Sequence, residues 1–192
     1  MAQPTVPGPA LQRQATVADW EAVPAPYTAH LIAGQLHVMP KPAPRHAMVE
    51  GGLLSTLLDP FHRGQGGPGG WVILSEVDVQ LGSEVVALDV AGWRRERMPE
   101  VPDEVRISLA PDWVCEVLFP RTEAFDRGGK AAWYARSGVD HMWFVDPTAR
   151  TLEVYRNDAG TWRPVPPTWR GAVVVSAPPF EALKWSLARL WG

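Results

Sequence analysis

The feature that most limits how this chain can fold is an isolated glutamate inside a short apolar run. Glu116 stands in residues 113–118 (WVCEVL), which show none of the polar–apolar alternation of a half-exposed strand. Such a run predicts a strand that is buried on both faces, within a sheet that helices cover. An ionised carboxylate buried there needs a compensating charge, hydrogen bonds or a metal ion.

A second acid lies in a similar setting upstream. Asp89 stands in residues 85–91 (VVALDVA), another run without alternation. Two buried acids in one small chain suggest a shared cation, and Mg²⁺ is typically held by one or two carboxylates together with water and substrate phosphate. Each acid could instead end its strand at the surface or pair with a basic side chain.

The rest of the chain predicts an α/β domain with a mixed central sheet flanked by helices. We expect helices at 16–20, 45–61, 122–137 and 180–190, with Thr16 as N-cap and Asp19 completing a capping box. We expect strands at 30–33, 35–39, 71–74, 76–81, 85–92, 112–118, 141–145, 151–156 and 161–165. Residues 1–15 are Pro- and Gln-rich and predict a disordered tail, which leaves 16–192 as a single domain.

Composition narrows the class of protein. The 192 residues carry a net charge of -3, which argues against a strongly basic DNA coat, and no stretch approaches the roughly 20 apolar residues of a membrane span. The single cysteine, Cys115, lies in the buried run, and no secretory signal is visible. We therefore expect a soluble, cytoplasmic protein with no membrane partner.

A lysine on the helix after Glu116 is the third candidate. Asp126, Lys130 and Tyr134 are spaced to share one helix face, and small residues surround Lys130. Lys130 could hold a phosphate or the attacking water as a compact positive charge. It could equally form a surface ion pair with Asp126, and the spacing does not separate the two.

These residues, in this order, carry a resemblance to a known family. The matching positions are Asp89, Glu116-Val117-Leu118 with Pro120, Asp126-Arg127 and Lys130, together with 34–36 (GQL), 44–46 (PRH), 67–71 (GPGGW), 91–97 (AGWRRER) and 139–143 (VDHMW) with Asp146-Pro147. The chain resembles the Uma2 family of the PD-(D/E)XK nuclease superfamily over about residues 25–191.

The resemblance implies a restriction-endonuclease-like fold and a Mg²⁺- or Mn²⁺-dependent endonuclease that hydrolyses DNA. It assigns Asp89 and Glu116 as metal ligands and Lys130 as the catalytic lysine, supplied by the helix rather than by position 118, which is leucine. It also implies a homodimer.

Three positions depart from the family pattern. Gln35 stands where a glutamate is usual, Leu88 replaces the proline before Asp89, and Phe119 replaces a serine before Pro120. Gln35 keeps an acceptor oxygen, so it remains an auxiliary candidate without charge. The departures also favour an alternative function, a binding or assembly module that keeps the nuclease scaffold with weakened or no activity.

The remaining auxiliary candidates are His46, Glu76 and Asp126. Glu76 matches an acidic position of the family, although it could also be a strand-edge charge that faces water. His46 lies at the start of the helix 45–61, where the helix terminus favours an anion. A capping-region histidine without a function is the alternative.

Overall fold

The computed structural model of the protein describes residues 13–192. The helical segments are α1 (Val17–Glu21), α2 (Pro44–Leu57), η1 (Leu58–Arg63), α3 (Glu123–Phe125), η2 (Asp126–Lys130), α4 (Ala131–Arg136) and η3 (Leu187–Leu190). The strands are β1 (Tyr27–Ile32), β2 (Gln35–Pro40), β3 (Trp71–Leu81), β4 (Glu84–Arg94), β5 (Arg106–Ile107), β6 (Trp113–Val117), β7 (His141–Asp146), β8 (Thr151–Asp158), β9 (Thr161–Pro164), β10 (Trp169–Arg170), β11 (Val174–Val175) and β12 (Trp185–Ser186).

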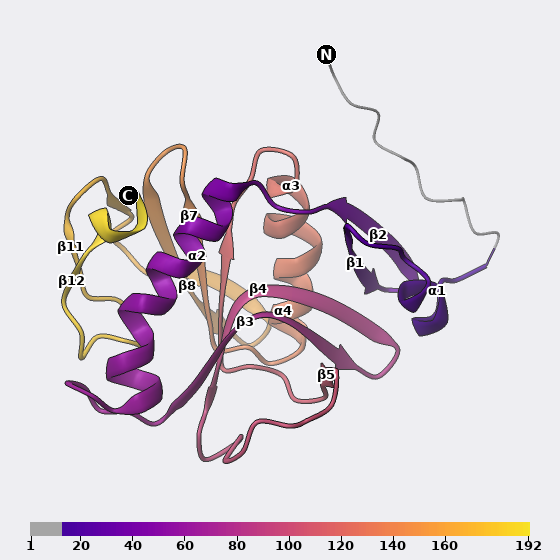
Figure 1. Ribbon diagram of the computed structural model, residues 1–192, viewed down its shortest axis with the longest axis horizontal. Helices are drawn as coiled ribbons and strands as arrows, with labels where there is room; N and C mark the ends of the chain where they lie inside the picture. Colours follow the sequence, from indigo (N-terminus) through magenta and orange to yellow (C-terminus); the bar gives the residue numbers. More distant parts are fainter. Residues whose placement is uncertain (1–12) are drawn as a thin grey trace.

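One large mixed sheet organises the chain (Figure 1). Its strand order is β10-β8-β7-β6-β4-β1-β2, with β3 paired to β4 and β5, and β9 paired to β8. The pairs β6–β7 and β3–β5 are parallel, whereas β4–β6 and β7–β8 are antiparallel. The predicted α/β class with a mixed central sheet is confirmed.

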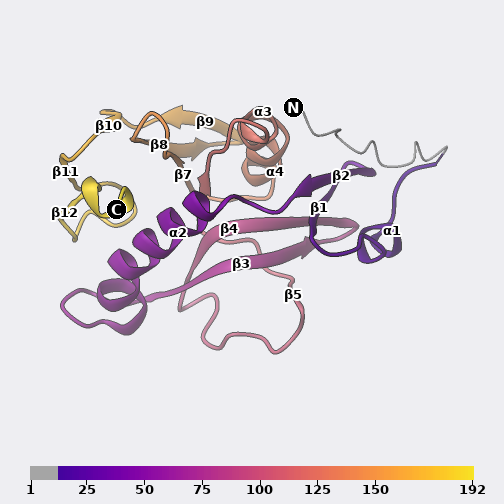
Figure 2. The same cartoon turned by 45° about the horizontal axis from the view of Figure 1, so that its top comes forward.

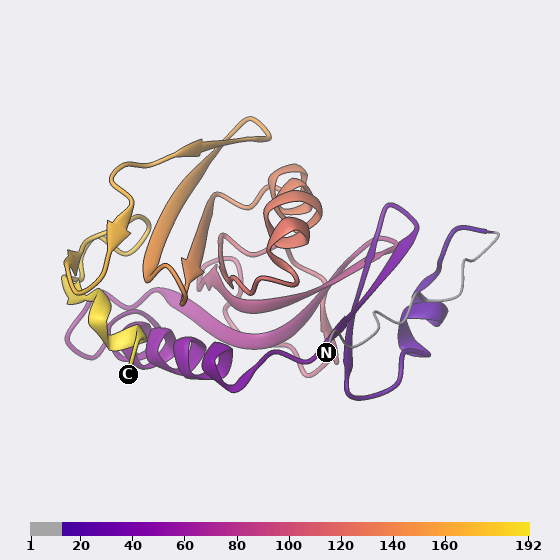
Figure 3. The ribbon, with the colours of Figure 1, turned by 90° about the horizontal axis from the view of Figure 1, so that it is seen from above.

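Helices cover both faces of this sheet, α2 on one side and α3–α4 on the other (Figure 3). The core under α2 includes Cys115 and Val117, and the core under α4 includes Val114 and Leu118. Alternate residues along β6 therefore enter opposite cores, as the pleat of a strand requires. All residues of β6 are buried, so the expectation of a strand buried on both faces is confirmed.

The N-terminal elements form an arm at the end of the sheet far from β11 and β12 (Figure 2). In α1, Thr16 and Asp19 form the predicted capping box. Ala33 and Gly34 both have positive φ, 51° and 71°, and join β1 to β2, the two strands expected at 30–33 and 35–39, in a tight hairpin. Most of the expected tail, residues 1–12, lies outside the described residues, and the Ala15 N–H donates to the Gly34 carbonyl at 2.8 Å.

The two long predicted helices are present, each with a π-helical segment. The helix predicted at 45–61 is α2 followed by η1, and the helix predicted at 122–137 is α3, η2 and α4 in succession. Gly138, with φ of 81°, follows the second helix as a left-handed terminator. The strands predicted at 71–74 and 76–81 are one continuous β3, which passes through a positive φ of 49° at Glu76.

The helix predicted at 180–190 is wrong. This segment forms the short strand β12 and the single 3-10 turn η3. Trp185 pairs with Val175 of β11, and Phe180 packs edge-on against Trp113 and Trp143 at centroid distances of 4.9 and 5.6 Å. Burial of aromatic side chains that do not share a helical face therefore overrides the helix propensity of the segment.

None of the helices within residues 13–192 is long and apolar enough to cross a membrane.

Candidate active site

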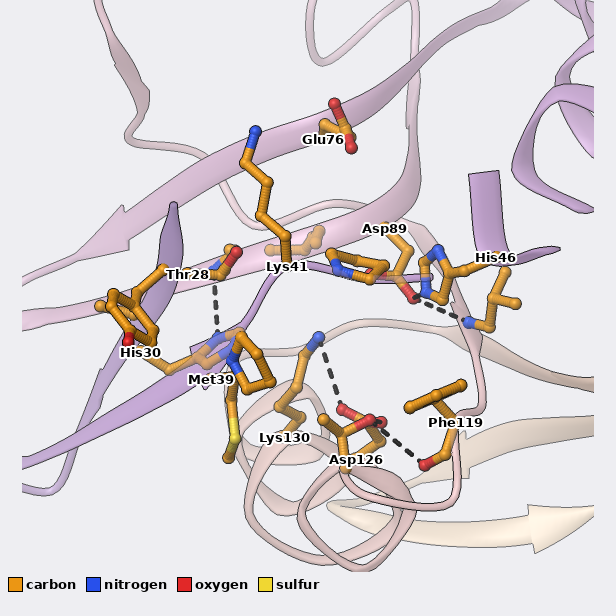
Figure 4. A pocket seen from close by; sticks show the side chains of 18 of the residues that line it. Thr28, His30, Met39, Lys41, His46, Glu76, Asp89, Phe119, Asp126 and Lys130 are labelled. Atoms are coloured by element: carbon orange, nitrogen blue, oxygen red, sulfur yellow. Dashed lines mark hydrogen bonds and ion pairs between the residues drawn. The ribbon is translucent and has the colours of Figure 1, made fainter. Parts of the chain in front are cut away.

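A cavity of about 690 Å³ lies where the β1–β2 hairpin, the start of α2, strands β3 and β4, the loop after β6, and η2 meet (Figure 4). The predicted site residues in its wall are His46, Glu76, Asp89, Asp126 and Lys130. Glu116 and Gln35 are not among the residues that line it. The structure thus brings most of the predicted set together, with two exceptions.

Asp89 lies where β4 and β6 stop pairing. Val90 and Cys115 form the last pair of their ladder. At the next residue of β4, the side-chain carboxylate of Asp89, and not a backbone carbonyl, accepts the hydrogen bond from β6. Its Oδ2 accepts a hydrogen bond from the Val117 N–H at 2.8 Å. Burial alone would raise the pKa of Asp89, but the hydrogen bond from His46 and the charge of Lys130 lower it to about 2. The carboxylate is therefore ionised, with its side chain 20% exposed to the cavity.

Two residues of α2 face Asp89. His46 and Glu50 are one helical turn apart, so both side chains lie on the same face. His46 Nε2 lies 3.0 Å from Asp89 Oδ2, and His46 Nδ1 lies 3.5 Å from Glu50 Oε2. Burial works against a charged ring, but the bond to Asp89 and the nearby Glu50 carboxylate outweigh it and raise the pKa of His46 to about 10. His46 is therefore a cation between two carboxylates.

These three residues also fit a divalent metal ion. One donor atom from each of His46, Glu50 and Asp89 lies within 4.8 Å of the others. Nδ1 of His46 is buried and forms no hydrogen bond with any residue in 13–192, and its one ion-pair contact is with Glu50, a member of the same set. Carboxylates suit Mg²⁺ and Mn²⁺, and an imidazole is typical of transition-metal sites, so the set favours Mn²⁺ over Mg²⁺. His46 has to lose its proton before it can act as a ligand.

Glu116 has a different environment from the one expected. Its side chain is 1% exposed and lies on the α4 face of β6. Oε2 accepts a hydrogen bond from Lys130 Nζ at 2.5 Å, and Oε1 accepts one from the Tyr134 hydroxyl. Glu116 is thus compensated by Lys130 and Tyr134 of the α3–α4 helix, and Glu116 itself does not line the cavity.

Lys130 connects this buried pair to the cavity. Its ammonium contacts Glu116, lies 3.8 Å from Asp126 Oδ1, and borders the cavity. Burial would lower the pKa of Lys130, but the carboxylates of Glu116, Asp89 and Asp126 raise it, so the ammonium stays charged. The Asp126–Lys130 pair exists, yet both side chains are buried, so the alternative of a solvated surface pair is wrong. The Thr122 hydroxyl holds Asp126 through a bond of 2.8 Å to Oδ2.

Of the two auxiliary candidates Gln35 and Glu76, only Glu76 lines the cavity. Gln35 is exposed beside the hairpin turn, directly after Gly34, and does not reach the cavity wall. Glu76 is exposed at the positive-φ position of β3 and does line the cavity. The neighbouring pairs Ser75–Val90 and Val77–Leu88 place it across the ladder from Asp89. Figure 4 shows Lys41 extending toward the strand that carries Glu76.

Sequence reasoning missed Glu50 and His30. Glu50 is 6% exposed on the apolar face of α2, next to Val49 and one turn after His46. A buried acid on an apolar helix face is the same signal that identified Glu116, so Glu50 could have been found. His30 of β1 lines the cavity, but only the pairing of β1 with β4 brings it near Asp89, and the sequence holds no local sign of that.

Solved structures include a close fold relative. A crystal structure from Anabaena variabilis, described as "a putative nuclease belonging to DUF820", matches with a TM-score of 0.72. The match covers 92% of this chain and 97% of that chain, at 19% sequence identity. At this identity the likeness shows a shared fold.

Sequence comparison identifies the family. An uncharacterized protein of Synechocystis sp. is 29% identical in an alignment of 96 residues that covers 44% of this chain and 50% of that protein. The chain therefore spans about half the length of this curated relative. The sequence profile of the family Uma2, described as "putative restriction endonuclease", matches residues 15–188. Because this match covers most of the chain, the protein belongs to the Uma2 family.

Proposed function

We propose that this protein is a metal-dependent endonuclease that hydrolyses DNA phosphodiester bonds. The observation that carries the proposal is the convergence of one imidazole and two carboxylates, from His46, Glu50 and Asp89, beside a charged lysine in one cavity. Membership of the Uma2 family and the fold shared with the Anabaena protein support the nuclease class.

In this proposal His46, Glu50 and Asp89 hold Mg²⁺ or Mn²⁺. A bound divalent cation would lower the pKa of a coordinated water and stabilise negative charge on the scissile phosphate. Asp89 supplies an ionised oxygen on the rigid sheet, and its bond from the Val117 N–H keeps that oxygen oriented. Lys130 supplies a positive charge at the cavity wall for a phosphate oxygen.

Glu116 has a different role in this proposal from that of the metal ligand which the family resemblance implies. Both of its oxygens already accept hydrogen bonds, from Lys130 and Tyr134. We assign Glu116 to positioning Lys130. As a metal ligand it would have to release one of these donors, and a buried charge pair loses much stability when one partner is removed.

The test is DNA cleavage by purified protein. Wild type should nick supercoiled plasmid with MnCl2 or MgCl2 and leave it intact in EDTA. Asp89→Asn keeps the shape of the side chain and removes its charge, so the cleavage rate should fall by roughly a hundred-fold or more. The matched control is Asp158→Asn, which changes an exposed acid of β8 that pairs with Arg163 and should cleave as wild type does. Equal rates for wild type and Asp89→Asn would contradict the proposal.

A second candidate, the binding or assembly module, is favoured by one observation. Asp89 already pairs with the charged His46, and Glu116 already pairs with Lys130, so the acids are neutralised without a metal. Calorimetric titration with MnCl2 separates the candidates: binding that Asp89→Asn abolishes supports the nuclease. A folded wild type that neither binds Mn²⁺ nor cleaves DNA supports the module.

A further inference from the structure

His30 is a buried residue of the cavity wall. It belongs neither to the proposed metal ligands His46, Glu50 and Asp89 nor to the Lys130–Glu116 pair. It lies on β1, has 5% of its surface exposed, and lines the cavity with Asp89 and Lys130. Its ring packs on Phe125 at a centroid distance of 5.2 Å. Figure 4 places His30 near Thr28 and Met39 of the hairpin, on the side of the cavity away from His46.

One ring nitrogen of His30 has a defined partner. Nδ1 accepts a hydrogen bond from the Ala87 N–H at 3.3 Å. A ring nitrogen that accepts a bond carries no hydrogen, so the hydrogen of the neutral ring must be on Nε2. The bond also ties His30 to β4 only two residues before Asp89. Burial and the charge of Lys130 lower the pKa of His30 well below its ordinary value, in agreement with a neutral ring.

The other ring nitrogen has no hydrogen-bond partner in the described part of the chain. Nε2 forms no hydrogen bond with a residue in 13–192, and it is not among the polar atoms that are sealed from solvent without a partner. A polar N–H on an otherwise buried side chain therefore reaches the cavity. A donor that faces the cavity without a partner among the described residues is free to bond an acceptor oxygen of a ligand there.

We infer that His30 is a further substrate-binding residue, whose Nε2–H donates to a non-bridging oxygen of the DNA phosphodiester. The inference rests on the proposed function for the identity of the substrate. A neutral donor fits this place, because the cavity already holds the charged ammonium of Lys130. A fixed N–H aimed at an oxygen strengthens its bond as negative charge develops on the phosphate. His30 and Lys130 would contact the phosphate from different walls of the cavity.

Substitutions of His30 by asparagine and by glutamine test the two ring nitrogens separately. In His30→Asn the amide oxygen lies near the position of Nδ1, so it can still accept the Ala87 N–H, but no donor reaches the position of Nε2. In His30→Gln the amide extends to the position of Nε2 and leaves the Ala87 N–H without its acceptor. His37→Asn is the control, since His37 is the hairpin partner of His30 and also stacks on Phe125, at 4.5 Å, but does not line the cavity.

We expect kcat/KM for cleavage of an oligodeoxynucleotide with MnCl2 to fall roughly ten- to a hundred-fold in His30→Asn. The rate should stay within a few-fold of wild type in His30→Gln and in His37→Asn. Thermal stability should rank the other way, with His30→Gln less stable than His30→Asn. Wild-type activity in His30→Asn, or activity that simply follows thermal stability, would overturn the inference.

A binding measurement keeps the inference separate from the proposed function. If wild type does not cleave DNA, the proposed function fails, and fluorescence anisotropy of a labelled oligodeoxynucleotide in EDTA then decides the role of His30. Weaker binding by His30→Asn, restored in His30→Gln, supports a phosphate contact. Equal affinity of wild type and His30→Asn refutes it.

Discussion

At the scale of single residues, the fold compensates the buried carboxylate of Glu116 with two hydrogen-bond donors. Glu116 is enclosed between strands and helix, and each of its oxygens accepts one hydrogen bond, from Lys130 and from Tyr134. Paired and fully hydrogen-bonded, a buried charge is tolerable, whereas either partner alone is not. Lys130 therefore has two tasks, holding Glu116 and presenting positive charge to the cavity.

This dual role predicts that Lys130→Met is destabilising as well as inactive. Removal of the ammonium leaves Glu116 buried with only the Tyr134 hydroxyl, and breaking a buried pair in this way costs about 3–5 kcal/mol. The measurement is the free energy of unfolding from urea titration, read by tryptophan fluorescence.

The double variant Lys130→Met with Glu116→Gln provides the control. Because it removes the orphaned charge, it should be more stable than Lys130→Met alone. If the two changes add without coupling, the pair does not carry the energy assigned to it.

At the scale of elements, the site depends on how α2 packs against the C-terminal turn η3. This helix carries His46 and Glu50, and its position is set where Gly52 meets the C-terminal turn η3. A Cβ added at Gly52 would lie 2.9 Å from the Arg189 carbonyl oxygen and 3.3 Å from Leu190. A Cβ added at the neighbouring Gly51 would have nothing within 4 Å.

Two adjacent alanine substitutions should therefore have opposite effects. Gly52→Ala forces α2 away from η3 and should lower the free energy of unfolding by about 1–3 kcal/mol. Gly51→Ala adds no contact and gains helix propensity, so it should raise stability by about 0.5–1 kcal/mol. Urea unfolding of both variants checks the pair, and a stabilised Gly52→Ala would show that α2 does not pack closely on the C-terminal turn.

The elements themselves were largely predictable because their signals are local. The capping box at Thr16, the two strands on either side of Gly34 and the unbroken apolar run at β6 each reflect the physics of a few consecutive residues. The C-terminal segment was not predictable, because its contacts are distant in sequence. Phe180 packs on aromatic side chains of β3, β6 and β7, and Trp185 pairs with strand β11. Local propensity gives way wherever such burial is available.

At the scale of the whole molecule, the cavity joins segments that are far apart in the chain. His30 and His46 come from the N-terminal quarter, Asp89 from β4, and Lys130 from the helix that follows β6. The proposed metal ligands His46, Glu50 and Asp89 bridge the α2 layer and the sheet. A metal ion bound there would therefore cross-link two layers of the fold.

Mn²⁺ should accordingly stabilise the entire protein. At a concentration about 100 times Kd, a ligand that binds only the folded state adds about 2.7 kcal/mol. For a chain of this length that corresponds to a rise in Tm of about 5–10 °C. The measurement is thermal unfolding with and without MnCl2. Asp89→Asn should lose the shift and Asp158→Asn should keep it, and a shift of equal size in Asp89→Asn would place the metal elsewhere.

The sequence by itself determined that two strands are buried, that each carries an acid, and that each acid must be compensated. These follow from composition along the strand and from the cost of a buried charge. Only the tertiary structure decided which cation pairs with which acid, His46 with Asp89 and Lys130 with Glu116. The register of β4 against β6 turns Asp89 toward α2 and the cavity, and the phase of the α3–α4 helix points Lys130 and Tyr134 at Glu116. Side-chain direction is set by strand register and helix phase, and both depend on packing between segments distant in the chain.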